Sequence, residues 1–371
     1  MEERVKKGKA IVWFVCFALL LLLPRAIWIA AGDRFETDAT ENAATVQFPK
    51  LTRGNYREFA AQFEGAYNNG VPFRSQLISF NSLLDVKVFG EKEINDKVVI
   101  RDEDWLFYSA ESDIDDFKGS NLFSEEELSA IADNLMTSKE WVEDRGIEFV
   151  LFIAPNKETI YGEDYLPSYY KRGEQTRVRQ LVDYLRENTD LRVVYPEEEM
   201  KEYKDDWSLY WHYDTHWNAA GAYIGARALL AELGIEVPPP EDVTFTQDDF
   251  SGYDLARMMN LQDYYEKNMA KDINYVVTGY EPNNLQAVSI DDATALVYHS
   301  DAPDQRKFFM VRDSFAGGMA GVLASNFADS YMAHWNGFFQ QSMVEEQDPD
   351  VFVLEVVERR LDYLSSFRLS D

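Results

Sequence analysis

The sequence predicts an α/β sandwich with a mostly parallel central sheet and helices on both faces, preceded by one membrane-spanning helix. Two observations carry this prediction. Strand-like and helix-like segments alternate along most of the chain, which is typical of parallel sheets with helical crossovers. In addition, Glu148–Ala154 and residues 350–357 are nearly continuous apolar runs, as expected of parallel strands that are buried on both faces.

The composition supports a large packed core and excludes several classes of protein. The chain has 371 residues, of which 46% are hydrophobic and 14% aromatic, so it is not a disordered chain. Its net charge of −30 argues against a nucleic-acid-binding protein, which needs clustered Lys and Arg. The single cysteine, Cys16, excludes an intramolecular disulfide and a cysteine-based zinc site.

The amino terminus has the pattern of a signal-anchor. Residues 1–10 carry four basic side chains, and an apolar run follows at residues 11–23, with a second at 26–31. The first run alone makes about 20 Å of helix, short of the ~30 Å hydrocarbon core, but the two together are long enough to span it. The positive-inside rule then places 1–10 in the cytoplasm and the rest of the chain outside it.

These patterns predict a cytoplasmic stub at 1–10, a transmembrane helix at 11–31, a polar tether at 32–52 and an extracytoplasmic domain at 53–371. The start of that domain, 53–95, is expected to be a helical preface. A cleaved signal peptide remains an alternative for the amino terminus, although residues 29–32 match an Ala-x-Ala cleavage site poorly. Both alternatives export the domain.

Periodicity and capping signals predict the elements of the domain. Two helices are expected between Tyr56 and Leu84, separated at Gly70 and Pro72. A capping box at Ser124 and Glu127 begins a helix that Gly146 ends. Further helices are predicted at 175–188 and 218–233, and strands at Val98–Ile100, 105–108, Glu148–Ala154, 191–195, 308–311 and 350–357, with an acidic turn at 102–104.

Residues 210–217 hold two of the four histidines, His212 and His216, on either side of Asp214. The segment could be an aromatic-rich edge of the core that happens to contain histidines. Two histidines on either side of an aspartate make this interpretation less favoured than a single histidine would. If the segment were a strand, all three side chains would share one face and could bind a metal. The alternative is that Asp214 orients His216 as a general base.

A serine stands where a nucleophile is expected. Ser314 follows the strand predicted at 308–311 and precedes the small residues 316–318, which begin a helix. Backbone N–H groups at a helix amino terminus stabilise an oxyanion. Ser314 could also simply cap the helix. Together with His216 and Asp214, however, it completes a nucleophile–base–aspartate set, for which we expect no metal and no cofactor.

A third block, at Asn156 and Lys157, directly follows the strand Glu148–Ala154. Asn156 could donate to an oxyanion and Lys157 could hold substrate, or the block could be a turn with Asn156 as a helix cap. Glu355 lies near the end of the last predicted strand, and the pair Arg359 and Arg360 follows that strand. They are expected to form an ion pair near the site.

Three motifs together resemble those of one family. The motifs Asp-Thr-His-Trp at 214–217, Arg-Asp-Ser-Phe at 312–315 and Pro-Asn-Lys at 155–157 are similar to those of the SGNH-hydrolase-like AlgX/AlgJ and DHHW group. That group contains exported O-acetyltransferases and acetylation factors for bacterial exopolysaccharides, with alginate the best-known substrate. The resemblance extends over about residues 55–363. It implies an SGNH-like three-layer sandwich.

The resemblance also implies roles for individual residues. Asp214, His216 and Ser314 match the family triad, in the permuted order Asp, His, Ser. Arg312 stands where classical SGNH enzymes have glycine, so the oxyanion and substrate contacts stay open among several candidates: Asn156, Lys157, Arg312, Trp217 and Arg359. The sequence shows no carbohydrate-binding module after Asp371, so we expect the chain to be closer to the membrane-anchored AlgJ type than to AlgX.

The expected activity is therefore O-acetylation of an extracytoplasmic polysaccharide through an acetyl-serine intermediate. The resemblance implies a membrane-bound O-acyltransferase as the partner that relays the acetyl group. The net charge of −30 favours a neutral or amino-sugar acceptor. Two alternatives remain at this point: an acetyl-esterase with the same triad, and a non-catalytic glycan-binding or assembly protein of an export complex.

Overall fold

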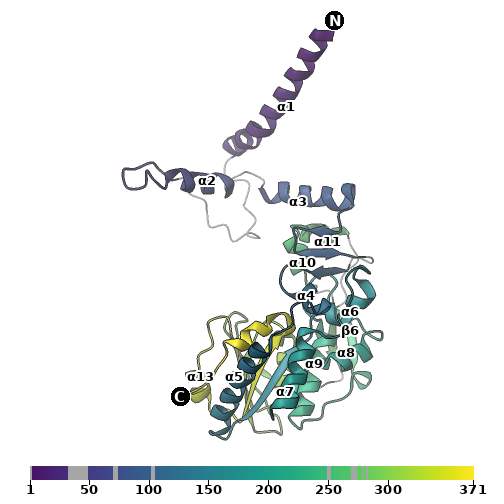
Figure 1. Cartoon of the computed structure of the whole chain (residues 1–371), viewed down its shortest axis with the longest axis vertical. Helices are drawn as coiled ribbons and strands as arrows, with labels where there is room; N and C mark the ends of the chain where they lie inside the picture. The colour runs from purple at the N-terminus through teal and green to yellow at the C-terminus, as the bar shows by residue number, and fades with distance from the viewer. Residues whose placement is uncertain are drawn as a thin grey trace. The chain divides into compact units, whose positions relative to one another are not determined.

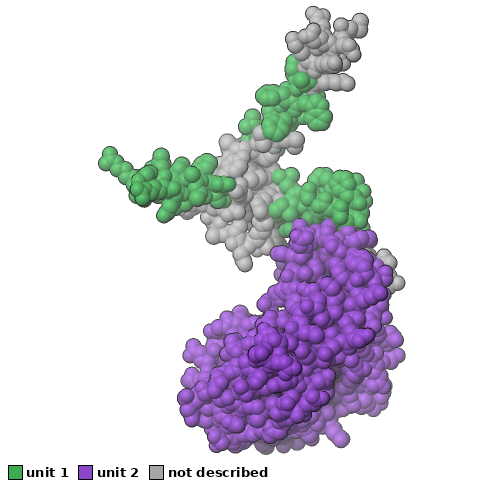
Figure 2. All heavy atoms as spheres, viewed as in Figure 1, with its two compact units in different colours: residues 1–91, 259–261 green, residues 92–258, 262–371 purple. Residues whose placement is uncertain are grey.

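The computed structural model describes residues 2–31, 49–69, 74–101, 105–248, 252–268, 274–278, 280 and 283–371. The chain divides into two compact units (Figure 2). One comprises residues 1–91 with 259–261, and the other comprises residues 92–258 with 262–371.

The first unit is helical. It contains α1 (Glu2–Ala31), α2 (Phe59–Asn69), α3 (Arg74–Leu84) and the short π-helix η2 (Asp85–Phe89), which ends at Gly90 with φ of 71°. The two helices predicted between residues 56 and 84 are therefore present. Their predicted break at Gly70 and Pro72 lies outside the described residues, as do most of the predicted tether, at 32–48, and the acidic turn at 102–104.

The helix α1 covers both the predicted cytoplasmic stub and the predicted membrane span. In the described part of the chain, no helix combines the length and the apolar character needed to cross a membrane. The transmembrane prediction is therefore not confirmed.

A seven-stranded sheet forms the centre of the second unit (Figure 1). Its strand order is β5-β4-β12-β10-β11-β9-β8. The bounds are β4 Glu148–Ala154, β5 Val193–Val194, β8 Gln286–Ile290, β9 Ala295–His299, β10 Lys307–Arg312, β11 Asp329–His334 and β12 Val351–Val357. The first five strands in this order run parallel, and β9 and β8 continue the sheet antiparallel. A mostly parallel sheet was predicted, and it is confirmed.

Helices cover both faces of this sheet, because its central strands are apolar on both faces. In β4, Phe149 and Leu151 pack into one hydrophobic cluster, whereas Val150 and Phe152 pack into the other. The first cluster includes residues of α5 (Glu125–Glu143), α7 (Arg177–Asn188) and α13 (Ser342–Gln347). The second includes residues of α6 (Lys157–Tyr165), α8 (Glu197–Tyr203), α9 (Ala219–Glu232) and α12 (Ala316–Ala324).

Smaller elements surround this sandwich. A three-stranded antiparallel sheet consists of β1 (Glu93–Ile94), β2 (Val98–Ile100) and β3 (Leu106–Tyr108), and a two-stranded one pairs β6 (Thr244–Asp248) with β7 (Asn274–Thr278). The remaining helices are α4 (Asp113–Lys118), α10 (Asp254–Met258), α11 (Gln262–Asn268) and the 3-10 helices η4 (Pro240–Asp242) and η5 (Glu358–Ser365).

The element predictions succeed where the local signal is strong. The strand β4 has the predicted bounds, and α5 begins with the predicted capping box, in which Ser124 and Glu127 satisfy each other's backbone N–H groups. The strand predicted at 191–195 is wrong in length, because only Val193 and Val194 pair with β4.

Removing the cap of α5 should destabilise the fold measurably. Ser124→Ala removes the acceptor of the Glu127 N–H, and we expect the free energy of unfolding to fall by about 1 kcal/mol. Ser129→Ala, at an exposed position inside the same helix, is the matched control and should leave it within ~0.5 kcal/mol. Urea denaturation measures both. Equal effects would show that the capping box is not stabilising.

Candidate active site

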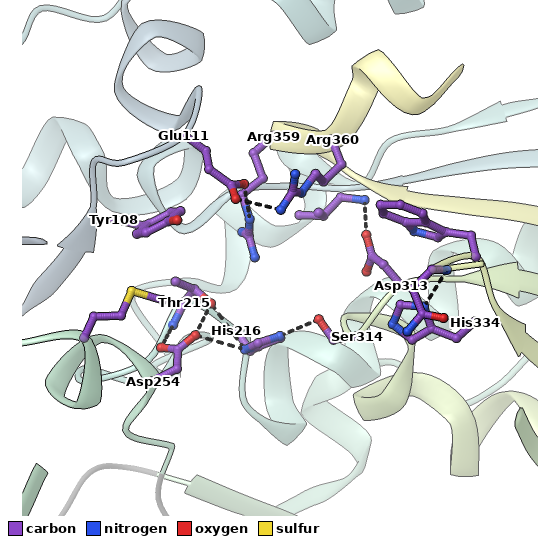
Figure 3. A pocket seen from close by; sticks show the side chains of 14 residues that line it. Tyr108, Glu111, Thr215, His216, Asp254, Asp313, Ser314, His334, Arg359 and Arg360 are labelled. Carbon is purple, nitrogen blue, oxygen red and sulfur yellow. Dashed lines mark hydrogen bonds and ion pairs between the residues drawn. The ribbon is translucent and has the colours of Figure 1, made fainter. Parts of the chain in front are cut away.

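Three side chains form one hydrogen-bonded chain, and one of them, Ser314, is distant in the sequence from the other two. The Ser314 hydroxyl lies 2.8 Å from Nε2 of His216 (Figure 3). Nδ1 of His216 lies 2.7 Å from Oδ1 of Asp214. Ser314 lies two residues after the end of β10, at the carboxyl end of the parallel sheet, where α/β folds place their sites. With the Nδ1 proton donated to Asp214, Nε2 is free to accept the serine proton.

The hydrogen-bonded residues lie at a pocket of about 360 Å³, in whose wall Ser314 is half-buried. The walls come from both sides of the triad: Tyr108, Glu111, Thr215, His216, Asp254, Met258, Asp313, Ser314, His334, Trp335, Asn336, Val357, Arg359 and Arg360. The guanidinium of Arg359 points into this space (Figure 3) and lies 5.0 Å from the ring of Phe315, next to the serine. Of the five candidate substrate or oxyanion residues, Arg359 alone lines the pocket.

The segment 210–217 is a turn, which corrects the strand reading on which the metal alternative depended. Tyr210 and Trp217 pair as an isolated antiparallel bridge, and the chain reverses between them. The ring of His212 stacks edge-on against Trp105, with centroids 4.3 Å apart. Within the described residues, the groups with metal-ligand spacing are Asp214, His216 and Asp254, so His212 does not belong to the set.

Lys157 holds the turn at residues 210–217 rather than substrate. Its side chain is 1% exposed, and Nζ lies within 3.1 Å of four backbone carbonyl oxygens, those of Leu106, Trp211, His212 and Asp214. These acceptors exceed the three protons of an ammonium group. The predicted substrate contact is therefore wrong, and Lys157 instead fixes the backbone that carries Asp214.

Asn156 is fully buried and does not line the pocket, so its predicted contact with an oxyanion is not supported. It occupies the N-cap position of α6 but makes no side-chain capping bond. Its backbone N–H donates to Glu358, and its Oδ1 accepts from the backbone N–H of Arg359 at 3.3 Å. Asn156 thus positions the segment that carries Arg359.

Arg312 is also buried, with its guanidinium donating to the carboxylate and the backbone carbonyl of Asp292. The next residue, Asp313, accepts from the N–H groups of Phe315 and Val357 and so ties the serine turn to the end of β12. Glu355 accepts from the Asp313 N–H, which corrects its predicted pairing with the two arginines. Arg312 and Asp313 therefore shape the turn around Ser314.

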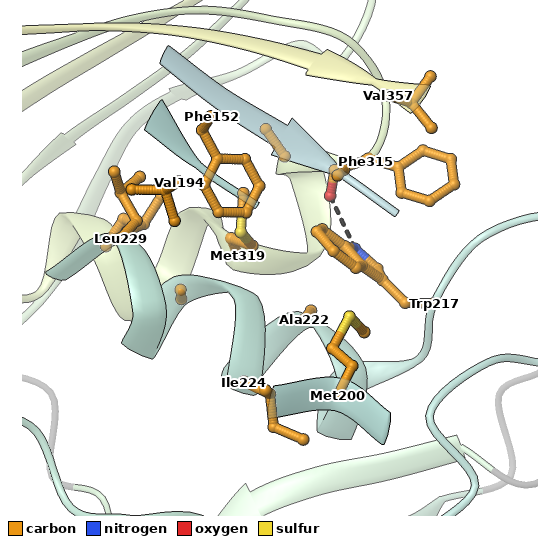
Figure 4. Packing of buried hydrophobic residues seen from close by; sticks show 14 of the residues in the cluster. Phe152, Val194, Met200, Trp217, Ala222, Ile224, Leu229, Phe315, Met319 and Val357 are labelled. Atoms are coloured by element: carbon orange, nitrogen blue, oxygen red, sulfur yellow. Dashed lines mark hydrogen bonds between the residues drawn. The ribbon is translucent and has the colours of Figure 1, made fainter. Parts of the chain in front are cut away.

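Trp217 packs against Phe315, the residue that follows the serine (Figure 4). Its indole N–H donates to the carbonyl of Phe315 at 2.9 Å, and its ring packs edge-on against the Phe315 ring. A Cβ added at Gly318 would come within 2.9 Å of Ala222 and 3.1 Å of the Trp217 indole nitrogen. Trp217 thus holds the start of α12 close to α9, which is a structural role and not the predicted substrate contact.

Asp254 is a site residue that the sequence did not reveal. Its carboxylate accepts from the Thr215 backbone N–H at 2.8 Å and from the Thr215 hydroxyl at 2.6 Å. It also lies 3.7 Å from Nδ1 of His216, and its own backbone N–H donates to Oδ2 of Asp214. Asp254 begins a short helix, and nothing in its local sequence marks it as functional.

The surroundings shift the pKa values of Asp214 and Asp254 in opposite directions. Burial raises the pKa of Asp214, but the hydrogen bond and charge of His216 outweigh it and hold that pKa well below its usual range. Burial and the neighbouring Asp214 charge raise the pKa of Asp254 to about 6. Burial lowers the pKa of His216, but Asp214 and then Asp254 more than offset this, so the net shift is upward. Such divergence between two carboxylates is common in catalytic sites.

More than half of the sequence matches one family model. Residues 98–304 match the family described as an SGNH hydrolase-like domain, acetyltransferase AlgX, and they make up more than half of the chain. The chain belongs to this family. The resemblance inferred from the motifs and the SGNH-like α/β fold are both confirmed. The matched range includes Asp214 and His216 but ends before Ser314, whose place in the site rests on the geometry.

Several solved structures resemble this family member. Bacillus cereus PatB1, solved with a sulfonyl adduct, aligns with a TM-score of 0.55 at 14% identity, over 75% of this chain and 100% of that chain. A DHHW family protein from Eubacterium siraeum aligns with a TM-score of 0.50 at 13% identity, over 75% of this chain and 97% of that chain. The O-acetyltransferase domain of Pseudomonas putida AlgJ aligns with a TM-score of 0.47 at 19% identity, over 74% of this chain and 94% of that chain.

At these identities, the PatB1 and DHHW alignments show a shared fold. A comparison with curated protein sequences found no match.

Removing the Lys157 ammonium should destabilise the SGNH-like domain. Lys157→Met keeps much of the volume but leaves the four carbonyl oxygens without this donor, so we expect a loss of about 3 kcal/mol in the free energy of unfolding. Lys267→Met, at an exposed salt bridge, should change it by less than ~0.5 kcal/mol. Urea denaturation distinguishes these results, and equal effects would contradict the assigned role.

The charge of Asp254 should affect the pH dependence of any activity that uses His216 as a base. A base must be neutral, and the raised pKa of His216 places the acid limb of kcat/KM above the ordinary histidine value of 6.5. The charged groups that act on the imidazole are Asp214, Asp254 and Arg359.

Asp254→Asn removes one negative charge and should move the acid limb to lower pH. The variant would then keep a larger fraction of its plateau rate at pH 6. Asp329→Asn, next to the surface histidine His299, is the matched control and should leave the limb in place. An unchanged limb in Asp254→Asn would show that its charge does not reach His216.

Proposed function

We propose that this protein transfers acetyl groups to the hydroxyls of a polysaccharide outside the cytoplasm, through an acetyl-serine at Ser314. The observation that carries the proposal is the continuous hydrogen-bonded chain from Ser314 through His216 to Asp214, which opens onto a pocket. Membership of the acetyltransferase AlgX family supports the acetyl group as the one transferred.

The first half-reaction forms the acetyl-enzyme. The hydroxyl proton of Ser314 moves to Nε2 of His216, 2.8 Å away, while Oγ attacks the acetyl carbonyl carbon. The resulting imidazolium is stabilised by Asp214 and by Asp254, 2.7 and 3.7 Å from Nδ1. His216 then gives its proton to the departing oxygen of the donor as the tetrahedral intermediate collapses.

Arg359 is suited to stabilise the negative oxygen of that intermediate. Its guanidinium points into the pocket near Phe315, and its ion pairs with Glu111 and Asp113 are long, at 3.9 and 3.8 Å. Burial lowers its pKa, but Asp113 and the other surrounding carboxylates more than offset this, so the net shift is upward and the group stays charged. A fixed positive charge beside the reacting carbonyl favours the oxyanion over the neutral ground state.

The second half-reaction passes the acetyl group to the acceptor. His216, again neutral, takes the proton of a sugar hydroxyl as that oxygen attacks the acetyl-serine, and the ester bond to Ser314 breaks. Acetyl-CoA is cytoplasmic, so an exported enzyme needs a relay, for which we propose a membrane-bound O-acyltransferase. The basic and apolar amino-terminal sequence supports a location at the outer side of the cell membrane.

An acetyl-esterase with the same three residues is the alternative enzyme, with water in place of the sugar hydroxyl. The pocket is open to solvent at Ser314, so access of water alone does not separate the two activities. A purely glycan-binding role would have been favoured by a buried Ser314, whereas this serine is half-buried at the pocket wall.

The test measures both half-reactions with the purified full-length protein and a chromogenic acetyl ester. We expect the wild type to release the chromophore, and Ser314→Ala and His216→Ala to lower kcat/KM by 10³-fold or more. Ser325→Ala is the matched serine control and should retain activity. If added oligosaccharide becomes acetylated, the protein is a transferase; release of acetate alone would favour the esterase. Equal rates in all variants would overturn the triad.

A further inference from the structure

A second cavity adjoins the triad pocket. It has a volume of about 480 Å³, larger than the 360 Å³ around Ser314. The two cavities share four lining residues, Glu111, Trp335, Arg359 and Arg360. Because they have these walls in common, the two cavities are neighbours, one at the serine and the other at η5, and together they are called the cleft.

The size of this cleft exceeds what acetyl transfer itself requires. An acetyl group fills only a small part of the first cavity, and pockets of ~300–1,000 Å³ hold ligands far larger than a two-carbon group. The second cavity therefore has room for a part of the substrate that takes no part in the chemistry. In a transferase of the proposed kind, that part is the acceptor.

The second cavity has the wall chemistry of a sugar site. The rings of Trp335 and Tyr363 both line it and stack on one another, with centroids 4.4 Å apart and an angle of 24° between their planes, so the stacked pair supplies an aromatic surface in its wall. Arg360 and Glu111 are hydrogen-bonded to each other beside it, at 2.6 Å, and Asp362 lines the same cavity. Sugars offer an apolar ring face and several hydroxyls, which match an aromatic surface bordered by planar polar groups.

The charges of the cleft favour an acceptor without charge. One of its two guanidiniums, that of Arg360, already faces a carboxylate, that of Glu111 at 2.6 Å. Further carboxylates line the cleft at Asp254, Asp313 and Asp362. A uronic-acid polymer would bring repeated negative charges into this acidic surrounding, in a protein of net charge −30.

We infer that the two cavities form a single acceptor cleft for an uncharged glycan chain. One sugar would present its hydroxyl to Ser314, and at least one neighbouring sugar would lie in the second cavity against Trp335 and Tyr363. This inference rests on the proposed acetyl transfer for its biological meaning. Binding to the cleft, however, is measurable without any chemistry.

The test measures binding to full-length Ser314→Ala, which cannot acetylate, by titration calorimetry. The probes are β-1,4-linked glucose and N-acetylglucosamine oligomers of one to six units, with oligogalacturonates of equal length as the charged series. We expect affinity for at least one uncharged series to rise tenfold or more between one unit and three. We expect the galacturonates to bind at least tenfold more weakly. Affinity that is independent of length, equal binding of galacturonates, or no binding of either uncharged series would overturn the inference.

Two variants in the same background locate the binding. Tyr363→Ala removes half of the aromatic surface, and Arg360→Ala changes a half-exposed side chain, so it should leave the fold intact. Both should weaken binding of the trimer by tenfold or more, while Arg368→Ala, an exposed arginine outside the cleft, should not. Melting temperatures identify any variant that has unfolded. Unchanged trimer binding in a folded Arg360→Ala and a folded Tyr363→Ala would contradict the assigned location.

The outcomes separate this inference from the proposed function. If binding does not depend on oligomer length but acetyl esters are hydrolysed, the acceptor cleft is wrong and the triad still stands. If binding depends on length but the wild type hydrolyses no acetyl ester, the acceptor cleft still stands and the proposed acetyl transfer is wrong.

Discussion

The site depends on one buried ammonium group. Lys157 follows the central strand β4, and its Nζ lies among carbonyl oxygens from β3 and from the turn that carries Asp214. A buried charge is costly unless hydrogen bonds replace its hydration, so this contact is stable only while the turn keeps its shape. The ammonium group therefore joins the rigid sheet to the irregular segment. It holds the carbonyl of Asp214 inward, while the carboxylate of that residue reaches His216 at 2.7 Å.

The electrostatics of the site follow from how close its charged groups lie to one another on this backbone. Two carboxylates, Asp214 and Asp254, lie at one imidazole, and the one with the direct hydrogen bond keeps its charge most strongly. The other is held in place by Thr215, which directly follows Asp214 in the chain and donates two hydrogen bonds to Asp254. On the opposite wall, Arg359 supplies positive charge where an acyl oxygen would develop negative charge. The arrangement suits a reaction in which His216 gains and loses a proton twice per cycle.

The sequence predicted the parts of this structure that have a local signal. The strand β4 is buried on both faces, which leaves an unbroken apolar run, whereas β8 is exposed along its whole length and gave no such pattern. Ser314 could be named because it stands between a predicted strand and a predicted helix. Asp214 and His216 could be named because two histidines flank an aspartate there and the motif is similar to that of the family. Asp254 could not, because it reaches the site from a distant short helix. The role of Lys157 was also hidden, since its partners are backbone carbonyls, which any sequence provides.

The most direct test of the central claim is to identify the residue that a sulfonyl fluoride modifies. Such reagents react with a serine only when a base removes its proton, so they report the Ser314–His216 contact without any assumption about the glycan. Peptide mapping by mass spectrometry after treatment should find one adduct, on Ser314, in the wild type. The same adduct should be absent from His216→Ala. Modification at another residue, or equal modification of Ser314 in His216→Ala, would contradict the account.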